Sequence, residues 1–173
     1  MQEGEFIFGL LSEADARMLL EWAYEGPYAV YNFQSDYGPE DPYDTLEELL
    51  DQRSPYYAVH DARGELVGFW GFGTSAEVTG ERLPAVFRED GSLTVGLGLR
   101  PDLTGKGLGL AFVRAGLEFA RKQFAPSGFR LFVLPWNERA MKVYERAGFR
   151  RVGTVMQKTL EGERPFVEMV REG

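Results

Sequence analysis

The segment from Leu97 to Gly109 holds the residues best suited to chemistry, because alternate glycines and a lysine follow an expected strand and lead into an expected helix. Its centre reads Thr-Gly-Lys-Gly-Leu-Gly at positions 104–109. Glycines let backbone N–H groups approach an anion closely, and the N-terminus of a helix favours negative charge. Lys106 adds a cation. A ligand that carries a pyrophosphate is therefore the expected guest.

The spacing of these glycines excludes two common nucleotide motifs. A P-loop needs Gly-x-x-x-x-Gly-Lys-Ser/Thr, but Arg100 stands at the first glycine position and Gly107 follows the lysine. The dinucleotide pattern Gly-x-Gly-x-x-Gly places Leu110 or Phe112 at its third glycine. A glycine-rich turn with a purely structural purpose remains the alternative.

A second block of residues follows at 131–149 and lets a family be recognised. Leu-Phe-Val-Leu-Pro-Trp at 131–136 precedes Asn137, an expected helix N-cap, and Ala140, Tyr144, Ala147, Gly148 and Phe149 follow. Together with the glycine segment, residues 93–153 resemble the core of the GNAT superfamily of acetyl-CoA-dependent N-acetyltransferases. The cofactor motif of that family, Arg/Gln-x-x-Gly-x-Gly/Ala, matches at both glycines, with Thr104 in place of the usual arginine or glutamine.

The resemblance implies acetyl-CoA as the cofactor and a role for each matching position. A bulged strand would pair its backbone with the pantetheine arm, a V-shaped gap to the neighbouring strand would hold the thioester, and the glycine loop would bind the pyrophosphate. Tyr144 lies two helical turns after Asn137 and would be the general acid that protonates the departing thiolate. An ordinary half-buried tyrosine is the alternative for Tyr144. The implied cofactor contacts are Leu97, Gly98, Leu99, Thr104, Gly105, Lys106, Gly107, Leu108, Gly109 and Asn137.

The general base and the acceptor site are less clear from the residues. The expected strand 92–98 offers no carboxylate, so Glu25, Asp36, Glu77 or a water molecule could take the proton of the amine. His60, the one imidazole, stands beside a turn and favours a surface or turn-stabilising role. Tyr28 and Tyr31 are the expected substrate contacts. With Trp22, Tyr24 and Phe33 they form an aromatic wall for an ammonium group or, equally well, core packing.

The elements that must position these residues follow from hydrophobic spacing and turn residues. We expect strands at 6–8, 56–60, 65–72, 93–99, 129–134, 151–158 and 165–170, and helices from Ser12 as N-cap, at 45–52, at 107–124 and from Asn137 to 147. The order predicts an α/β fold in a single domain over 1–173, with flanking helices and a mostly antiparallel sheet. The resemblance implies a central parallel strand pair that splays apart.

Composition narrows the classes of function. Of the 173 residues none is cysteine and one is histidine, which excludes disulfides, thiolate chemistry and a multi-histidine metal site, so no metal is expected. The net charge is −8, but residues up to Leu99 hold 5 Lys/Arg against 19 Asp/Glu and the remainder 14 against 8. A basic half suits a polyanionic cofactor and an acidic half suits an amine, although unevenly placed surface charge is an equal alternative.

These observations favour a cytoplasmic enzyme that acetylates a small-molecule amine. No apolar run is long enough for a membrane span, the N-terminus lacks the layout of a secretory signal, and no basic stripe with interleaved aromatics indicates nucleic acid. A protein N-terminal or lysine acetyltransferase and a non-catalytic CoA-binding or CoA-sensing module are the alternatives. The oligomeric state stays open, with a homodimer as one option.

Overall fold

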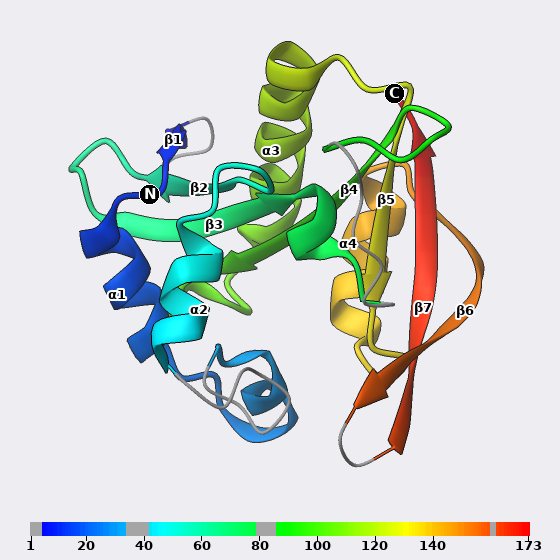
Figure 1. Ribbon diagram of the computed structural model, residues 1–173, viewed down its shortest axis with the longest axis horizontal. Helices are drawn as coiled ribbons and strands as arrows, with labels where there is room; N and C mark the ends of the chain where they lie inside the picture. Colours follow the sequence, from blue (N-terminus) through cyan, green and yellow to red (C-terminus); the bar gives the residue numbers. More distant parts are fainter. Residues whose placement is uncertain (1–4, 34–41, 79–85, 160–161) are drawn as a thin grey trace.

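One mixed sheet forms the centre of the molecule in the computed structural model, which describes residues 5–33, 42–78, 86–159 and 162–173 (Figure 1). The strand order is β1-β2-β3-β4-β5-β7-β6, and β4 and β5 form the parallel pair. The strands are β1 Ile7–Leu10, β2 Tyr56–His60, β3 Leu66–Phe72, β4 Ser92–Leu99, β5 Gly128–Val133, β6 Arg150–Thr159 and β7 Gly162–Glu172. The helices are α1 Glu13–Glu21, α2 Pro42–Leu49, α3 Gly109–Phe124 and α4 Glu138–Arg146, with short 3-10 turns η1 Gly26–Tyr31, η2 Gly73–Ala76 and η3 Pro101–Leu103.

Local sequence explains where the helices begin and end. The Ser12 hydroxyl accepts a hydrogen bond from the Asp15 N–H at 3.1 Å, and the Asn137 side chain does the same for Ala140 at 3.2 Å. Both residues are therefore N-caps, as the sequence predicts. After α4, Gly148 has a φ of +97°, a conformation that glycine adopts without strain.

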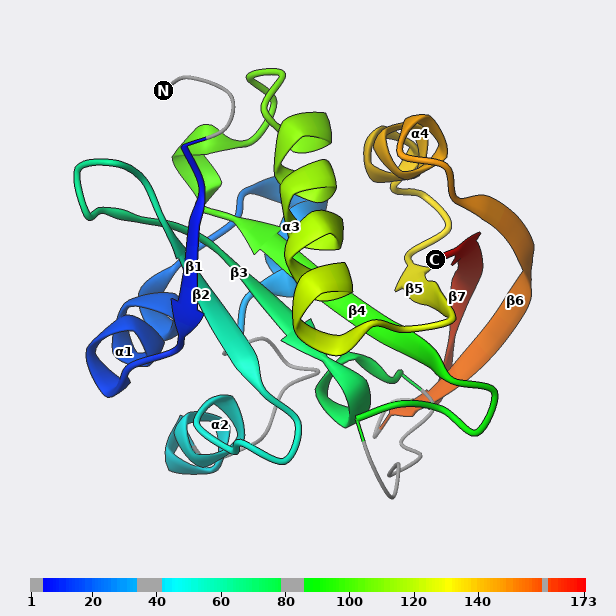
Figure 2. The ribbon, with the colours of Figure 1, turned by 90° about the horizontal axis from the view of Figure 1, so that it is seen from above.

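The helices cover the two faces of the sheet (Figure 2). On one face, α3 contributes Phe112, Val113 and Leu117 to the larger core, and α4 contributes Met141. On the other face, α1 and α2 build a smaller core around Leu19 and Leu49. This two-sided packing holds the middle strands rigidly and fixes the end of β4, from which the glycine loop starts.

The strands β4 and β5 pair only at their beginnings and then separate. Ser92, Leu93 and Thr94 pair with Gly128, Phe129 and Arg130. Within the described ranges of the chain, β4 pairs from Val95 onward with β3 alone, and β5 pairs from Leu131 onward with β7 alone. The predicted splayed parallel pair is confirmed, and its open side lies toward the end of β4 (Figure 2).

The fold corrects two expectations. The β4 strand carries no bulge at Leu97–Leu99, because its register with β3 runs without a shift from Val95 to Leu99. Gly98 is instead required by close packing, since a Cβ there would stand 2.4 Å from Cε1 of Phe69. The second helix begins at Pro42 and ends at Leu49, three residues earlier at each end than predicted. Proline suits the first turn of a helix, where its missing N–H costs nothing.

No helix among the described residues is long and apolar enough to cross a membrane.

Candidate functional site

The glycine loop joins the end of β4 to the start of α3. Gly105 and Gly107 have φ values of +71° and +79°, in the left-handed region where other residues are strained. A Cβ on Gly107 would meet no atom within 4 Å. Within the described part of the chain, the backbone N–H groups of residues 105–109 donate no hydrogen bond, and no side chain caps α3. The loop thus presents N–H donors at a helix N-terminus, the arrangement that binds phosphate.

Thr104, which departs from the family motif, has a structural partner. Its hydroxyl donates to the Pro101 carbonyl at 2.7 Å and so closes the 3-10 turn η3. Arg100 anchors the same turn, because its guanidinium binds the Asp102 carboxylate at 2.6 Å and the Leu66 carbonyl at 3.1 Å. These bonds hold the loop in place from its N-terminal side.

A cation that the motif does not include lies beside the loop. Arg139, in the first turn of α4, has an Nη1 atom 3.6 Å from the place where a Cβ on Gly105 would stand. Its guanidinium also lies 4.3 Å from the centre of the Tyr28 ring. Sequence reasoning missed Arg139 because nothing in its spacing marks it. Its place two residues after the N-cap Asn137 is the signal that could have drawn attention to it.

The expected cofactor contact Asn137 is a buried residue that links η1 to the start of α4. Its amide nitrogen donates to the Tyr31 hydroxyl at 2.9 Å, while its oxygen caps α4. Only 7% of Asn137 is exposed. Both ends of this side chain are therefore occupied within the protein, and its contact with a cofactor stays a prediction.

Tyr28 and Tyr31 lie together against the start of α4, next to Trp136. The Tyr28 and Tyr31 rings are centred 5.3 and 6.1 Å from that indole. Trp136, itself 43% exposed, was not expected in the site. The three rings bring η1 beside the end of β5, so this part of the N-terminal segment borders the open side of the β4–β5 gap.

The other aromatic residues of the expected wall have different positions. Trp22 and Phe33 pack against Phe69 in the core of the α1 and α2 face. The hydroxyl of Tyr24 donates to the carbonyl of Leu99 at 2.6 Å, and burial raises the pKa of Tyr24. The five aromatic residues therefore do not form one wall. Trp22, Phe33 and Tyr24 serve packing and a backbone contact, whereas Tyr28 and Tyr31 lie beside Trp136.

Tyr144 is half-buried on α4, edge-on to Phe149 with the ring centres 6.1 Å apart. Burial raises the pKa of its phenol, and the nearby Tyr31 adds to the effect. Tyr144 therefore keeps its proton at neutral pH. Its hydroxyl makes no hydrogen bond to any described residue, so the proton is available to a ligand.

Of the carboxylates considered as bases, Glu77 is the one tied to β4. It accepts hydrogen bonds from Arg88 Nε at 2.9 Å, Arg88 Nη2 at 2.7 Å and the Thr94 hydroxyl at 2.5 Å. Its side chain is fully buried. Glu25 is exposed, and Asp36 lies outside the described residues. His60 is half-buried at the end of β2, and its Nε2 lies 3.1 Å from the Asp15 carboxylate.

We expect Glu77→Gln to lower the free energy of unfolding by about 2 kcal/mol, because it leaves the Arg88 charge beside a neutral amide in a buried place. Chemical denaturation followed by circular dichroism measures the change. Glu65→Gln is the control, since Glu65 is 60% exposed and 3.9 Å from Arg100, and should change stability by less than about 0.5 kcal/mol. Equal stability of the two variants would contradict a structural role for Glu77.

The known sequences that this chain resembles are acetyltransferases. A family model described as "Acetyltransferase (GNAT) family" matches residues 17–149. Over 103 residues, 60% of this chain, the sequence is 41% identical to mycothiol acetyltransferase of Streptomyces coelicolor (strain ATCC BAA-471 / A3(2) / M145). The match covers 29% of that protein, so the chain spans well under half the length of this curated relative.

Solved structures of the same fold cover almost the whole chain. AAC(6')-Ib, an aminoglycoside acetyltransferase, in complex with ribostamycin and coenzyme A superposes with a TM-score of 0.72 at 26% identity, over 97% of this chain and 93% of that one. A chimera of the spermidine N-acetyltransferase SpeG from Vibrio cholerae has a TM-score of 0.74 at 19% identity, over 98% and 96% of the two chains. The second likeness bears on the fold alone.

Proposed function

The chain belongs to the acetyltransferase (GNAT) family, and on this premise we propose that it transfers an acetyl group from acetyl-CoA to a primary amine of a small molecule, by direct attack in a ternary complex. The observation that carries the proposal is the separation of β4 from β5 after Thr94, with the glycine loop at the end of β4. Two parallel strands that separate beside an anion-binding loop would let one long ligand lie between the strands and bind the loop with its phosphates.

The residues at this place fit the cofactor. The N–H groups of residues 105–109 would hold the pyrophosphate, with Lys106 and Arg139 supplying positive charge. The carbonyl and N–H groups of Leu97 and Leu99 that face away from β3 would hold the arm, although Tyr24 already occupies the Leu99 carbonyl. When bound, acetyl-CoA supplies the acetyl group as an activated thioester.

The side chains around the gap would orient the reactants and hold a proton. Tyr144 keeps its phenolic proton at neutral pH, so it is the candidate general acid. Tyr28, Tyr31 and Trp136 would line the acceptor side and exclude water. One face of Tyr28 is already covered by Arg139, so the other aromatic faces are the ones open to an ammonium group.

The relatives support a small acceptor without naming it. Mycothiol stands in the name of one relative, and the structure of another protein that this chain resembles holds ribostamycin. An acceptor side walled by the aromatic rings of η1 and Trp136 agrees with such a molecule, whereas a protein acceptor would need an open groove. Acetylation of a protein N-terminus or lysine is therefore the second candidate.

A rise in melting temperature with acetyl-CoA tests the cofactor directly, because a ligand that binds the native state stabilises it. We expect a rise of several degrees at a concentration about a hundredfold above the dissociation constant, which corresponds to about 2.7 kcal/mol. ATP and NAD are the control ligands and should give no comparable rise, because the glycine spacing fits neither.

Gly107→Val is the matched variant for this measurement. The position has open space around it but a φ of +79°, so valine would strain the loop without disturbing the core. The variant should lose the rise with acetyl-CoA. A wild-type protein that shows no rise at saturating acetyl-CoA would exclude the proposed reaction, whatever the variant does. Where the rise is seen, release of free thiol with a panel of amines identifies the acceptor.

A further inference from the structure

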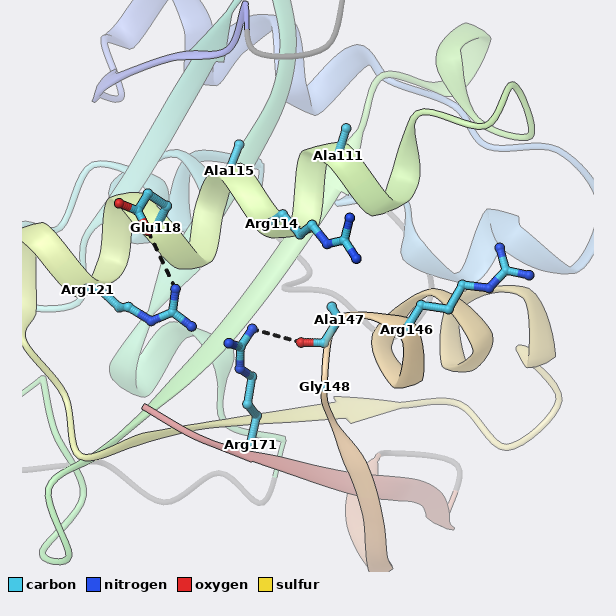
Figure 3. A pocket seen from close by; sticks show the side chains of 9 residues that line it. All are labelled: Ala111, Arg114, Ala115, Glu118, Arg121, Arg146, Ala147, Gly148 and Arg171. Carbon is cyan, nitrogen blue, oxygen red and sulfur yellow. Dashed lines mark hydrogen bonds and ion pairs between the residues drawn. The ribbon is translucent and has the colours of Figure 1, made fainter.

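A pocket of about 660 Å³ lies between α3, the end of α4 and β7, on the face of the sheet that α3 and α4 cover (Figure 3). Four arginines line it: Arg114, Arg121, Arg146 and Arg171. Among the residues that the structure describes, Glu118 is the one acidic residue of the lining. Three alanines and a glycine form the rest, which leaves room for a ligand. This concentration of positive charge stands out in a protein with a net charge of −8.

Arg121 and Arg171 point toward one another in the pocket, and Arg114 points toward α4 (Figure 3). Arg114 and Arg121 project from α3 and Arg171 from β7 into the space between the two helices, while Arg146 lines the edge along α4 (Figure 3). The Arg171 Nη1 atom donates to the Ala147 carbonyl at 2.7 Å, which fixes its direction. A Cβ on Gly148 would stand 3.5 Å from Arg171 Nε, so this glycine lies directly against the guanidinium.

The acid in the pocket does not balance these charges. Glu118 is 3.5 Å from Arg121 and 3.3 Å from Lys122, so two cations share it. Neither Arg114 nor Arg146 forms an ion pair with another described residue. Burial lowers the pKa of Arg171, and the charges of Arg121 and Arg114 lower it further. Like charges gathered in one pocket are stabilised by an anion between them.

We propose that this pocket is a second anion site, which binds a small polyvalent phosphate at a place separate from the glycine loop. The planar guanidinium fork matches phosphate oxygens in a bidentate way, and several such forks select a multiply charged guest over a single carboxylate. A volume of about 660 Å³ is that of a small-molecule site. A pyrophosphate or triphosphate group therefore fits both the charge and the space.

The far end of the pocket is separated from the cofactor loop along α3. The helix begins at Gly109, and Arg121 is twelve residues further on, about 18 Å along the axis at 1.5 Å per residue. Arg171 stands near that far end, beside Arg121. An anion held by these two arginines would not occupy the N–H groups at the start of the helix. The pocket and the loop can therefore be filled at the same time.

Isothermal titration calorimetry with inorganic pyrophosphate tests the proposal on protein saturated with acetyl-CoA, so that the glycine loop is already filled. We expect one binding event that weakens as salt is added. The double variant Arg114→Gln/Arg121→Gln should bind pyrophosphate at least about tenfold more weakly, because it loses two charge-assisted contacts. Arg63→Gln/Lys158→Gln removes two exposed cations elsewhere and should leave the affinity unchanged.

Glu118→Gln gives a second, independent readout. It removes the acid that competes for Arg121, so pyrophosphate should bind several-fold more tightly. Circular dichroism establishes that each variant is folded. Absence of binding to the saturated protein, or equal affinity in the arginine double variant, overturns the proposal. So does a double variant that loses acetyl-CoA affinity as strongly as pyrophosphate affinity, because the arginines would then serve the cofactor.

The test of the arginine pocket does not depend on the proposed acetyl transfer. If acetyl-CoA does not bind at all, the same titration is made on the free protein. A pyrophosphate bound at the glycine loop is lost in Gly107→Val, whereas one bound in the pocket is lost in the arginine double variant.

Discussion

Replacing Tyr144 with phenylalanine is expected to lower kcat by about a hundredfold while leaving the affinity for acetyl-CoA within about twofold of the wild type. A positioned general acid contributes typically 10²- to 10⁴-fold, and the lower end applies where water can replace it. The ring of Tyr144 packs against Phe149, and phenylalanine keeps that contact. Steady-state kinetics of thiol release and calorimetric titration of the cofactor measure the two quantities separately.

The electrostatics of the site give the sign of the pH dependence. Burial raises the pKa of Tyr144 above the ordinary tyrosine value of about 10. A tyrosine acid works in its protonated form, so the wild-type kcat should show no falling limb from this group until the pH exceeds about 10. A fall in kcat at acidic pH that the wild type and Tyr144→Phe share would belong to the amine or to its base.

Tyr57→Phe is the matched control for Tyr144→Phe. Tyr57 is also buried, and burial also raises its pKa, but it packs against Phe72 and Phe119 in the larger core. The kcat of the Tyr57→Phe variant should stay within about twofold of the wild type. If Tyr144→Phe retains full kcat as well, Tyr144 is not the acid. If the wild type has no turnover with any amine but binds acetyl-CoA, the chain is a CoA-binding module.

The sequence predicts most of the fold because its local signals agree with one another. The predicted order of strands and helices is confirmed in the described residues, and the N-caps Ser12 and Asn137 stand where expected. The splayed parallel pair was implied by family resemblance, and only the registers of the paired strands reveal that it opens after Thr94. Element ends were less certain, since hydrophobic spacing marks the middle of a helix better than its first turn.

The site was predicted in part, and the failures have a common cause. The spacing of glycines along the chain marks a loop whose backbone N–H groups can be presented to a ligand, so the loop at Gly105 and Gly107 could be proposed from the sequence. Contacts between distant segments leave no such pattern. The bond from Asn137 to Tyr31, the ring contacts of Trp136 and the position of Arg139 beside the loop all join residues from separate elements. The arginine pocket is built from α3, α4 and β7, so it could not be predicted from the sequence for the same reason.

Gly116→Ala is expected to lower the free energy of unfolding by about 3 kcal/mol, the largest stability effect that we predict. A Cβ on Gly116 would stand 2.0 Å from two ring atoms of Trp70, Cε2 and Cζ2. Both residues are buried, and a tryptophan held in a packed core cannot turn aside without displacing its neighbours. Alanine favours a helix by about 1 kcal/mol over glycine, which the steric cost exceeds.

The effect of Gly116→Ala should extend from the core to the site. Trp70 on β3 and Gly116 on α3 meet where the helix crosses the sheet, and the same helix begins with the glycine loop. A forced separation of α3 from β3 would therefore shift the loop N–H groups, so the variant should also bind acetyl-CoA more weakly. Denaturation and cofactor titration are measured on the same preparation. Gly153→Ala, with no atom within 4 Å of its new Cβ, should change neither, and a stable Gly116→Ala protein would show that α3 can move away from Trp70 at little cost.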